Sequence, residues 1–481
     1  MNYMFLSCTS LKFLNLSNFK TPSLQRINQM FNKCYKLTYL DISNLDTSLV
    51  TNMNYLFRDC RLLISLNLSN FNTSCVKTMY GMFYQCWSLK SLNLKNFRTP
   101  NLSNVTKMFY NCTSLEYLDL SNFNTSKIKD MSSLFYYSSS LQNINITNFD
   151  TSSVENMNSM FRNCVKLISL NLSNFKTELV SNMDYMFSNC KKLISLNLSN
   201  FHTPHLETMY RMFYNCNFLT DLDINNLNTS NVTNFERLFF SCKKLINLNL
   251  SSFDTSSAVN MSEMFRNCTN LEFLDLKNFY TPCLEASKAI FYGCNSLKWV
   301  DISNFNTSKI EDLSYLFFNC ISLTSLDLGN FDTKKVTNLE CMFEQCQSLR
   351  SLDLSNFNTN LTNSIYKMFY NCRSLQYLNI NSFNTEKIIN MNYSFYNTKS
   401  LISLNLSNFS INEITKIDNI FSNSNPNLIL CFNESKMPPH FITEVSKYKN
   451  SCLDLCIMNS KKYIQDLDIC VDNCFNETVY K

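Results

Sequence analysis

Hydrophobic residues recur along this chain with a fixed period of 26 residues. A phenylalanine stands at Phe5, Phe31 and Phe57 and returns at the same spacing to Phe421, seventeen times without an insertion or deletion. The repeat reads MFxxCxxLxxLNLSNFxTxxVxxM. Self-similarity at this period is typical of arrays in which each repeat packs only on its neighbours. The sequence therefore predicts one continuous solenoid instead of several globular domains.

The first half of each repeat has the alternation of a short strand. Leu11, Leu14 and Leu16 reproduce the LxxLxL core of a leucine-rich repeat. Leu14 and Leu16 lie two residues apart and share a face, so Phe13 and Asn15 point to the other side. We expect one short parallel strand per repeat, with its outward positions forming an exposed sheet.

The second half of the repeat has apolar residues at helical spacing. Leu24, Ile27, Phe31 and Cys34 follow this spacing. Thr21 is the predicted N-cap, and a proline follows the threonine in four repeats, at Pro22, Pro100, Pro204 and Pro282. The predicted fold class is an α/β repeat, a leucine-rich-repeat-like solenoid with one short parallel strand and one short helix per 26-residue turn.

The repeat loses its register after Asn423. We predict a solenoid of about 16 repeats over residues 1–424, a cap or linker over residues 425–451, and a cysteine-rich tail over residues 452–481, whose truncation stays open. The N-terminus begins inside a repeat, without the basic region, apolar run and cleavage site of a signal peptide. This leaves two alternatives, an intracellular protein or a chain that lacks its leader and first cap.

Composition removes several classes of function. Lys and Arg number 42 against 37 Asp and Glu, and no basic stripe is visible along the sequence, which argues against a nucleic-acid or charged-lipid partner. No apolar run approaches the length of a membrane span. With three glycines and three histidines, no phosphate loop or catalytic motif is recognisable, and the pair His202 and His205 lacks further metal ligands. We expect no enzyme activity, no cofactor and no metal.

Most cysteines occupy one position of the repeat. Fourteen of the 22 do so, from Cys8 to Cys372, and the position is otherwise held by Ser138, Thr398 and Ser424. Parallel side chains in neighbouring repeats do not have the twisted geometry of a disulfide. We predict free buried thiols that act as small hydrophobic groups.

The C-terminal cysteines do not follow the repeat. We predict disulfide bonds among them, which would place this segment outside the cell. The alternative is reduced cysteines in a capping helix. The candidates are Cys431, Cys452, Cys456, Cys470 and Cys474.

A solenoid binds through its exposed sheet, so the outward positions are the candidate binding residues. Carboxylates stand at one such position in four consecutive repeats, and aromatic residues occupy the adjacent column in two of them. This surface would suit a basic peptide, a cation or a sugar. The alternative is drift between Asn and Asp at a position that accepts either. The residues are Phe273, Asp275, Trp299, Asp301, Asp327 and Asp353.

The pattern MFxxCxxLxxLDLSNFNT, intact from Met108 to Thr125, resembles the repeat of BspA-like leucine-rich-repeat surface proteins, which is related to repeats in mycoplasma lipoproteins. The resemblance covers about residues 1–424. It implies a non-catalytic cell-surface or extracellular protein that adheres to protein or glycan partners on a host, matrix or neighbouring cell. The chain departs from the surface members because it shows no signal peptide or lipid-attachment cysteine. The alternative function is an intracellular structural scaffold for protein–protein interaction.

Overall fold

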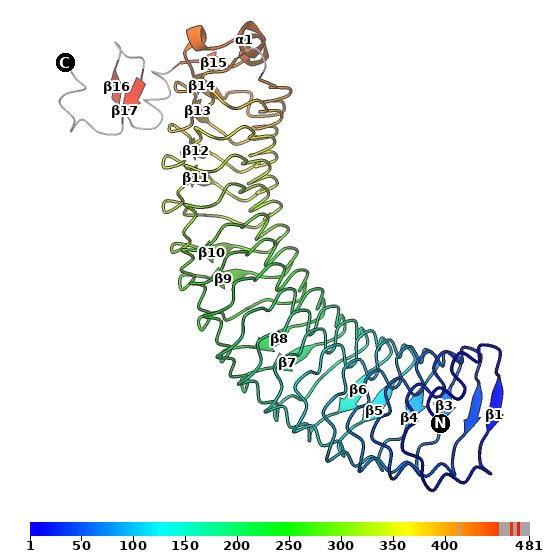
Figure 1. Cartoon of the computed structure of the whole chain (residues 1–481). Helices are drawn as coiled ribbons and strands as arrows, with labels where there is room; N and C mark the ends of the chain where they lie inside the picture. Colours follow the sequence, from blue (N-terminus) through cyan, green and yellow to red (C-terminus); the bar gives the residue numbers. More distant parts are fainter. Residues whose placement is uncertain (413–414, 452–461, 465–468, 472–481) are drawn as a thin grey trace. The chain divides into compact units, whose positions relative to one another are not determined.

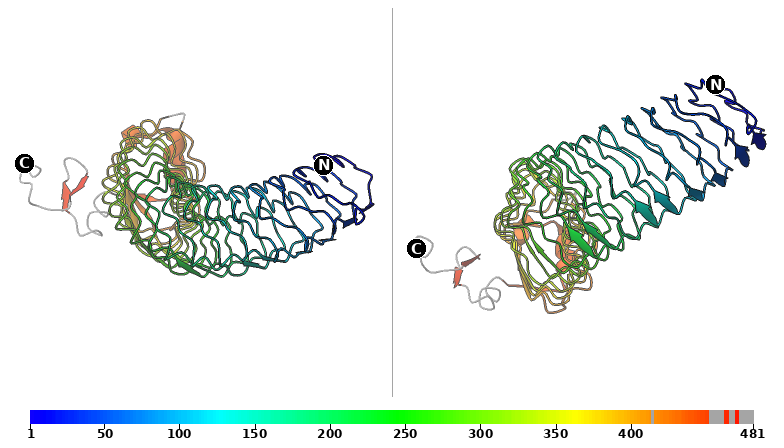
Figure 2. Two further views of the ribbon diagram at one scale, coloured as in Figure 1. Left: turned by 60° about the horizontal axis from the view of Figure 1, so that its bottom comes forward. Right: turned by 90° about the horizontal axis from the view of Figure 1, so that it is seen from below.

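The computed structural model describes residues 1–412, 415–451, 462–464 and 469–471, with only the backbone described in the last two ranges. The chain divides into two compact units, Met1–Asp254 and Thr255–Lys481, called unit 1 and unit 2 below. Each unit is a stack of similar coils, one coil per repeat, and each coil is called a rung (Figure 1). The short strands of the blue and cyan rungs in unit 1 line one side of the stack (Figure 2, right). The predicted solenoid is therefore confirmed.

The strands are two or three residues long and lie where the leucine pattern predicted them. Those of unit 1 are β1 (Phe13–Asn15), β2 (Tyr39–Asp41), β3 (Ser65–Leu66), β4 (Ser91–Leu92), β5 (Tyr117–Asp119), β6 (Asn143–Asn145), β7 (Ser195–Asn197) and β8 (Asp221–Asp223). Those of unit 2 are β9 (Phe273–Asp275), β10 (Trp299–Asp301), β11 (Ser351–Asp353), β12 (Tyr377–Asn379), β13 (Ser403–Asn405), β14 (Ile429–Cys431) and β15 (Lys449–Asn450). The antiparallel pair β16 (Lys462–Ile464) and β17 (Ile469–Val471) follows.

Strands of neighbouring rungs pair in parallel, displaced by one repeat. In the pair β1 and β2, Leu14 lies opposite Leu40, and Phe13 lies opposite Tyr39. Because successive side chains point to opposite faces of a strand, the leucine enters the core while its neighbour faces outward. Leu40 is buried and Tyr39 is exposed, as the sequence pattern predicted.

The prediction of one helix per repeat is wrong. Among the described residues the helices are η1 (Glu434–Lys436) and α1 (Pro439–Val445), both after the last repeat. The return stretch of each rung is a run of β-turns. In one rung, the amide of Met30 donates to the carbonyl of Ile27 over 3.1 Å, and the amide of Asn32 donates to the carbonyl of Gln29 over 3.2 Å. These bonds span three residues, whereas an α-helix spans four.

Backbone amides that are not used within the turns donate hydrogen bonds to the next rung. The amide of Gln29 donates to Asn54 O over 2.9 Å, and the amide of Phe31 donates to Leu56 O over 3.0 Å. Gln29 has a φ of 56°, in the left-handed region, which turns its N–H along the stack. A helix would consume these donors inside its own rung. The stacked turns with these bonds between rungs, called the turn ladder below, hold the rungs together on the side away from the strands.

The turn ladder also explains why the sequence looked helical. In the rung of Phe31, the inward positions are Ile27, Met30, Phe31 and Cys34, and all four side chains are buried. Met30, Phe31 and Cys34 follow Ile27 by three, four and seven residues, which is the spacing of one face of a helix. Consecutive turns bury the same positions, so hydrophobic periodicity could not distinguish the two structures.

The predicted helix cap at Thr21 is also wrong. Its hydroxyl accepts a hydrogen bond from the amide of Asp46 in the next rung, 2.9 Å away. Thr47, one repeat later, is buried, and its hydroxyl donates to Asn72 O over 3.0 Å while accepting from Asn72 N over 2.8 Å. The threonine column thus links rungs. Pro22 occupies the second position of a β-turn closed by Thr21, where a fixed φ near −65° is favoured.

Phenylalanine and leucine columns form the core within each unit. The rings of Phe31 and Phe57 stack with centroids 5.7 Å apart and an interplanar angle of 3°. In unit 2 the rings of Phe317 and Phe343 stack at 5.9 Å. All four side chains are fully buried. A single rung could not bury such a ring alone, because the rings of the adjacent rungs cover its faces.

The cysteine column is free and, apart from Cys8, buried, which confirms that prediction. Thiols of the later rungs also donate hydrogen bonds, a role that the sequence did not reveal. The thiol of Cys60 donates to the carbonyl of Phe31 in the preceding rung over 3.2 Å. Where Ser138 replaces the cysteine, its hydroxyl donates to the equivalent carbonyl of Phe109 over 2.9 Å. The position therefore selects a small side chain that can donate a hydrogen bond.

Residues after the last repeat extend the sheet and end it. β14 pairs in parallel with β13, and β15 pairs in parallel with β14, beside α1 (Figure 1). The hydroxyl of Tyr448 donates to Phe421 O over 2.8 Å, and its ring meets the Phe421 ring edge-on at 5.8 Å. This tyrosine covers the last ring of the phenylalanine column. The proposed boundaries at residues 424 and 451 remain predictions, and most of the predicted tail lies outside the described residues.

Candidate binding face

The two predicted aromatic residues lie side by side on the strand face of unit 2. β9 and β10 pair so that Phe273 is opposite Trp299. Phe273 is 51% exposed and Trp299 is 42% exposed. The register of a parallel pair brings these side chains together although 26 residues separate them in the sequence. They form a small aromatic surface on the outward side of the sheet.

The four predicted carboxylates lie on consecutive rungs beside the aromatic pair. Asp275 and Asp301 are paired at the ends of β9 and β10, and Asp353 ends β11. Asp327 holds the same repeat position on the rung between β10 and β11, outside a named strand. Asp275, Asp327 and Asp353 are exposed, and Asp301 is half-buried.

Each carboxylate uses one oxygen to end its own strand. Asp301 Oδ1 accepts from the amide two residues later over 3.0 Å, and Asp353 Oδ1 does so over 2.8 Å. Asn15 makes the same bond with its side-chain oxygen over 2.8 Å. At the equivalent position of unit 1, hydrogen bonds from Ser43 hold the pKa of Asp41 below its ordinary value. The position thus requires a side-chain oxygen, which both Asn and Asp supply.

The second carboxylate oxygen distinguishes the four residues. Lys277 Nζ lies 3.4 Å from Asp275 Oδ2. Within the described ranges, no lysine or arginine lies within 4.0 Å of the carboxylates of Asp301, Asp327 or Asp353. These three rungs therefore present outward acceptor oxygens with unneutralised charge.

The sequence interpretation missed a cation next to the aromatic pair. Lys298 Nζ lies 2.6 Å from Glu272 Oε2 and 5.4 Å from the centroid of the Phe273 ring. Glu272 and Lys298 are one repeat apart and each precedes a predicted strand, so the spacing alone could have identified this ion pair. The candidate face is mixed in charge at β9 and negative beyond β10.

A second aromatic arrangement in unit 1 was also missed. On the turn side, the rings of Tyr84, Tyr110 and Tyr136 stack in sequence with centroids 4.5 Å apart. The guanidinium groups of Arg58 and Arg162 lie over the two end rings, at 5.1 and 5.6 Å. Burial raises the pKa of Tyr110 to about 12. The signal was a tyrosine after the repeat phenylalanine in three consecutive repeats, and the arrangement serves packing between rungs.

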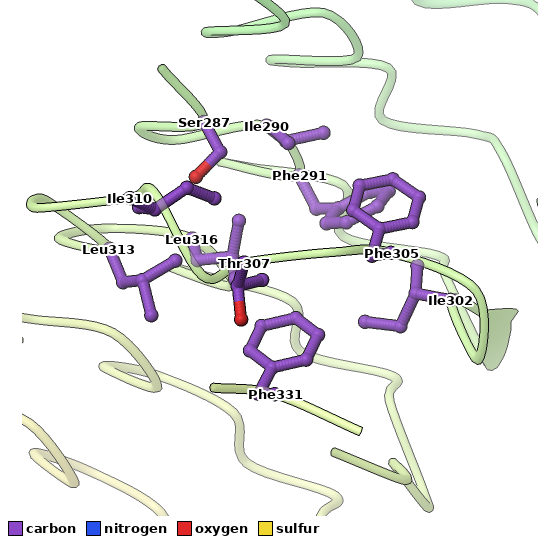
Figure 3. Close-up of a pocket in the computed structure, with 10 residues that line it drawn as sticks. All are labelled: Ser287, Ile290, Phe291, Ile302, Phe305, Thr307, Ile310, Leu313, Leu316 and Phe331. Carbon is purple, nitrogen blue, oxygen red and sulfur yellow. The ribbon is translucent and has the colours of Figure 1, made fainter. Parts of the chain in front are cut away.

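A small cavity lies in unit 2, where Ser287 replaces a large apolar residue. Met261 and Leu313 hold the same repeat position in the adjacent rungs and are buried. The cavity measures about 10 Å³, and its lining is apolar apart from the hydroxyls of Ser287 and Thr307 (Figure 3). That volume is close to the smallest that holds one water molecule. The cavity is a packing defect and is too small for a ligand.

The described residues contain neither a cluster with the arrangement of a metal site nor a helix that could span a membrane. His202 and His205 are both exposed. Across the described part of the chain, no group of three His, Cys, Asp or Glu side chains has the arrangement of a metal site. Over the same residues, no helix has the length and apolar character required to cross a bilayer.

The predicted disulfide cysteines are only partly visible. Cys431, at the end of β14, is buried and disulfide-bonded. Cys452, Cys456 and Cys474 lie outside the described residues, and only the backbone of Cys470 is described. The predicted pairing among these five cysteines remains a prediction.

Comparison with known proteins gives a family match over most of the chain. The protein-family model described as "Mycoplasma protein of unknown function, DUF285" matches residues 1–118, 104–223, 207–322, 285–402 and 311–434. No curated protein matches the chain.

Three solved structures illustrate the likeness in fold. A leucine rich cell surface protein from Faecalibacterium prausnitzii A2-165 is 17% identical, with 68% of this chain and 75% of that chain covered and a TM-score of 0.34. The functional domain of InlJ from Listeria monocytogenes, which includes a cysteine ladder, is 13% identical, with 88% and 69% covered and a TM-score of 0.18. The TLR13-ssRNA13 complex gives 17% identity, 92% and 66% coverage and a TM-score of 0.25. At such values these likenesses carry no argument about function.

Proposed function

The chain belongs to the family of mycoplasma-type repeat proteins designated DUF285, and on this premise we propose that it is a non-catalytic binding protein that recognises protein or glycan partners through the strand face of unit 2. The observation that carries the proposal is the exposed pair Phe273 and Trp299, on adjacent strands beside three carboxylates with free outward oxygens. Adjoining exposed apolar side chains that are bordered by polar residues are typical of interaction sites.

The chemistry of this face limits the partner. Aromatic faces stack on sugar rings and on cationic groups, and carboxylates accept hydrogen bonds from sugar hydroxyls or pair with lysine and arginine. A glycan or a basic peptide would satisfy both features. Nucleic acid would be repelled by Asp301, Asp327 and Asp353.

The resemblance to BspA-like proteins supports a finer proposal, adhesion at the cell surface. The disulfide at Cys431 supports an extracellular location, because disulfides persist mainly in oxidising compartments. An intracellular scaffold is the alternative. Counting accessible thiols in purified protein under denaturing conditions, before and after reduction, separates the two. Disulfides in protein isolated from its natural source favour export, and a fully reduced set favours the scaffold.

A triple variant tests the binding face directly. Asp301→Asn and Asp327→Asn keep the oxygen that ends each strand and remove the charge, as Asn15 illustrates, and Trp299→Ala removes the aromatic surface. The full chain is screened against a glycan array and a set of basic peptides, and the best probe is titrated. The variant should bind at least about tenfold more weakly, since a few central side chains dominate most interfaces. Equal binding by the variant, or no bound probe, would remove this face as the site.

A matched control comes from the turn region of the same unit. Asp332 is half-buried, and its Oδ1 ends a turn by accepting from Lys334 N over 3.1 Å. Asp332→Asn removes one negative charge at a position outside the strands that carry the aromatic pair. Its affinity for the probe should match that of the unmodified chain, and a similar loss would indicate a non-specific charge effect.

A further inference from the structure

Four consecutive rungs of unit 1 carry lysines and large apolar residues at the positions just before their strand segments. Three of these rungs contribute lysines, and all four contribute one exposed apolar side chain. In the sequence these residues are spread over four repeats, which is why no basic stripe is visible there. This surface, called the basic edge, consists of Lys166, Ile168, Lys191, Lys192, Ile194, Phe218, Lys243, Lys244 and Ile246.

The apolar side chains of the basic edge are open to solvent on adjoining rungs. Phe218 is 54% exposed, Ile194 and Ile246 are each 47% exposed, and Ile168 is 43% exposed. The backbone places them next to one another, since the amide of Ile194 donates to Ile168 O over 3.1 Å, and Thr220, two residues after Phe218, donates to Ile194 O over 2.9 Å. Ile168, Ile194 and Phe218 thus lie on three successive rungs, and Ile246 lies on the next one along the sequence.

Four lysines of the basic edge lie away from carboxylates. Elsewhere in unit 1, Lys129 Nζ lies 2.8 Å from Glu155 Oε1. Within the described ranges, the ammonium groups of Lys166, Lys191, Lys192 and Lys244 have no carboxylate within 4.0 Å. All five lysines of the edge are exposed. The positive charge of Lys166, Lys191, Lys192 and Lys244 is therefore available to an incoming partner.

The two carboxylates of β8 do not cancel the charge of the basic edge. Both are on β8, which follows Phe218. Asp221 is exposed, and Asp223 uses Oδ1 to accept from Asn225 N over 3.2 Å. Lys166, Lys191, Lys192 and Lys244 outnumber these two carboxylates and leave a net positive surface.

We infer that the basic edge docks an acidic peptide segment of a partner protein, one that also carries aliphatic or aromatic side chains. The lysines would pair with its carboxylates, and the isoleucines and Phe218 would cover its apolar side chains. A nucleic acid or an anionic polysaccharide would match the charge and leave the apolar cluster in water. This inference does not depend on the proposed function, which concerns unit 2.

The extent of the basic edge favours a peptide over a lipid surface. Four rungs span three intervals of about 4.8 Å, or roughly 15 Å. The preceding rung has the uncharged polar residues Ser140 and Gln142 at the equivalent positions, so the edge ends there. Binding to a bilayer by an apolar face ordinarily uses a larger apolar area together with its basic groups.

A peptide titration tests the inference. The probe is a short fluorescein-labelled peptide in which glutamate alternates with leucine, and the full chain is added while fluorescence anisotropy is followed. The four-lysine variant combines Lys191→Gln, Lys192→Gln, Lys243→Gln and Lys244→Gln. Its affinity for the peptide should fall by up to about tenfold, because several exposed charge pairs each contribute a small amount. Binding to the unmodified chain should weaken as salt rises.

Two controls assign the effect to the edge. The first control removes the same charge from unit 2 by the substitutions Lys309→Gln, Lys334→Gln, Lys335→Gln and Lys387→Gln. Its affinity for the peptide should stay within about twofold of that of the unmodified chain. Ile194→Ser with Phe218→Ser should weaken binding of the glutamate–leucine peptide and leave a glutamate–serine peptide unaffected. Thermal melting checks that each variant remains folded.

Three results would overturn the inference. The first is an affinity of the four-lysine variant equal to that of the unmodified chain or of the unit 2 control. The second is absence of peptide binding by the unmodified chain. The third is tighter binding to vesicles of phosphatidylserine in phosphatidylcholine, lost in the four-lysine variant, which would assign the edge to a lipid surface. Loss of glycan binding in the unit 2 face variant is a separate outcome.

Discussion

The thiol of Cys86 donates a hydrogen bond to the main-chain carbonyl of Phe57, 3.1 Å away in the preceding rung. The same carbonyl accepts from the amide of Cys60 over 3.1 Å, which closes a turn. One buried carbonyl oxygen thus joins a turn within its rung to the side chain of the next. The relationship recurs along each unit and explains why serine can replace cysteine.

Comparing Cys86→Ser with Cys86→Ala isolates this hydrogen bond, since serine and alanine are similar in volume. Serine can donate to Phe57 O as Ser138 donates to Phe109 O. We expect the serine variant to be more stable by about 1 kcal/mol, the usual net value of a buried hydrogen bond. Urea unfolding followed by circular dichroism measures the difference. Equal midpoints would mean that the position requires small size alone.

Stability should fall at alkaline pH because the buried thiols resist ionisation. Burial raises the pKa of Cys112, Cys216 and Cys346 from 9.0 to about 12. Between these values the unfolded chain releases thiol protons that the folded chain retains, so the free energy of unfolding decreases as pH rises. Below pH 9 this contribution is fully present.

Urea midpoints measured from about pH 8 to pH 11 check this dependence. The triple variant Cys112→Ser, Cys216→Ser, Cys346→Ser should show a shallower decrease than the unmodified chain. Tyrosine ionisation is common to both proteins and cancels in the comparison. An identical slope in both proteins would contradict the assignment to thiols.

Filling the cavity beside Ser287 should stabilise unit 2. Ser287→Met restores the kind of residue found at this position in the adjacent rungs and removes a buried hydroxyl that has no hydrogen-bond partner. We expect a gain of about 1 kcal/mol, typical of cavity-filling changes. Thermal melting provides the readout. Ser303→Met, at an exposed position, is the control, and a loss of stability in Ser287→Met would show that the surrounding rungs cannot make room.

Removing one hydroxyl from the threonine column should weaken the contact between two rungs. Thr47→Val keeps the shape of the buried side chain and loses both hydrogen bonds with Asn72. The amide and carbonyl of Asn72 lose their partner, so we expect a cost of about 1 to 3 kcal/mol. Hydrogen exchange at Asn72 should accelerate. In Thr51→Val, where the residue is exposed, exchange should stay unchanged, and equal rates in both variants would count against a linking role.

The candidate face was predictable in part. Asp275 and Asp301 could be placed together because strand register in a regular repeat equals the repeat length. The ion pair of Lys298 with Glu272 follows from the same register, but these residues stand outside the aspartate and aromatic positions that marked the candidate face. The lysines of the basic edge were missed for a related reason, since the sequence scatters Lys192 and Lys244 by two repeats.

The sequence by itself determined the repeat length, the strand positions, the inward leucine and phenylalanine columns and the free cysteines, because all of these depend on a period that can be counted. Only the tertiary structure decided that the return stretch is a ladder of turns. Helix and turn ladder bury the same positions, Ile27, Met30 and Phe31 among them, so their hydrophobic patterns are identical. The choice depends on where backbone amides such as that of Gln29 find acceptors. Those acceptors belong to the next rung, and they exist only once the rungs have stacked.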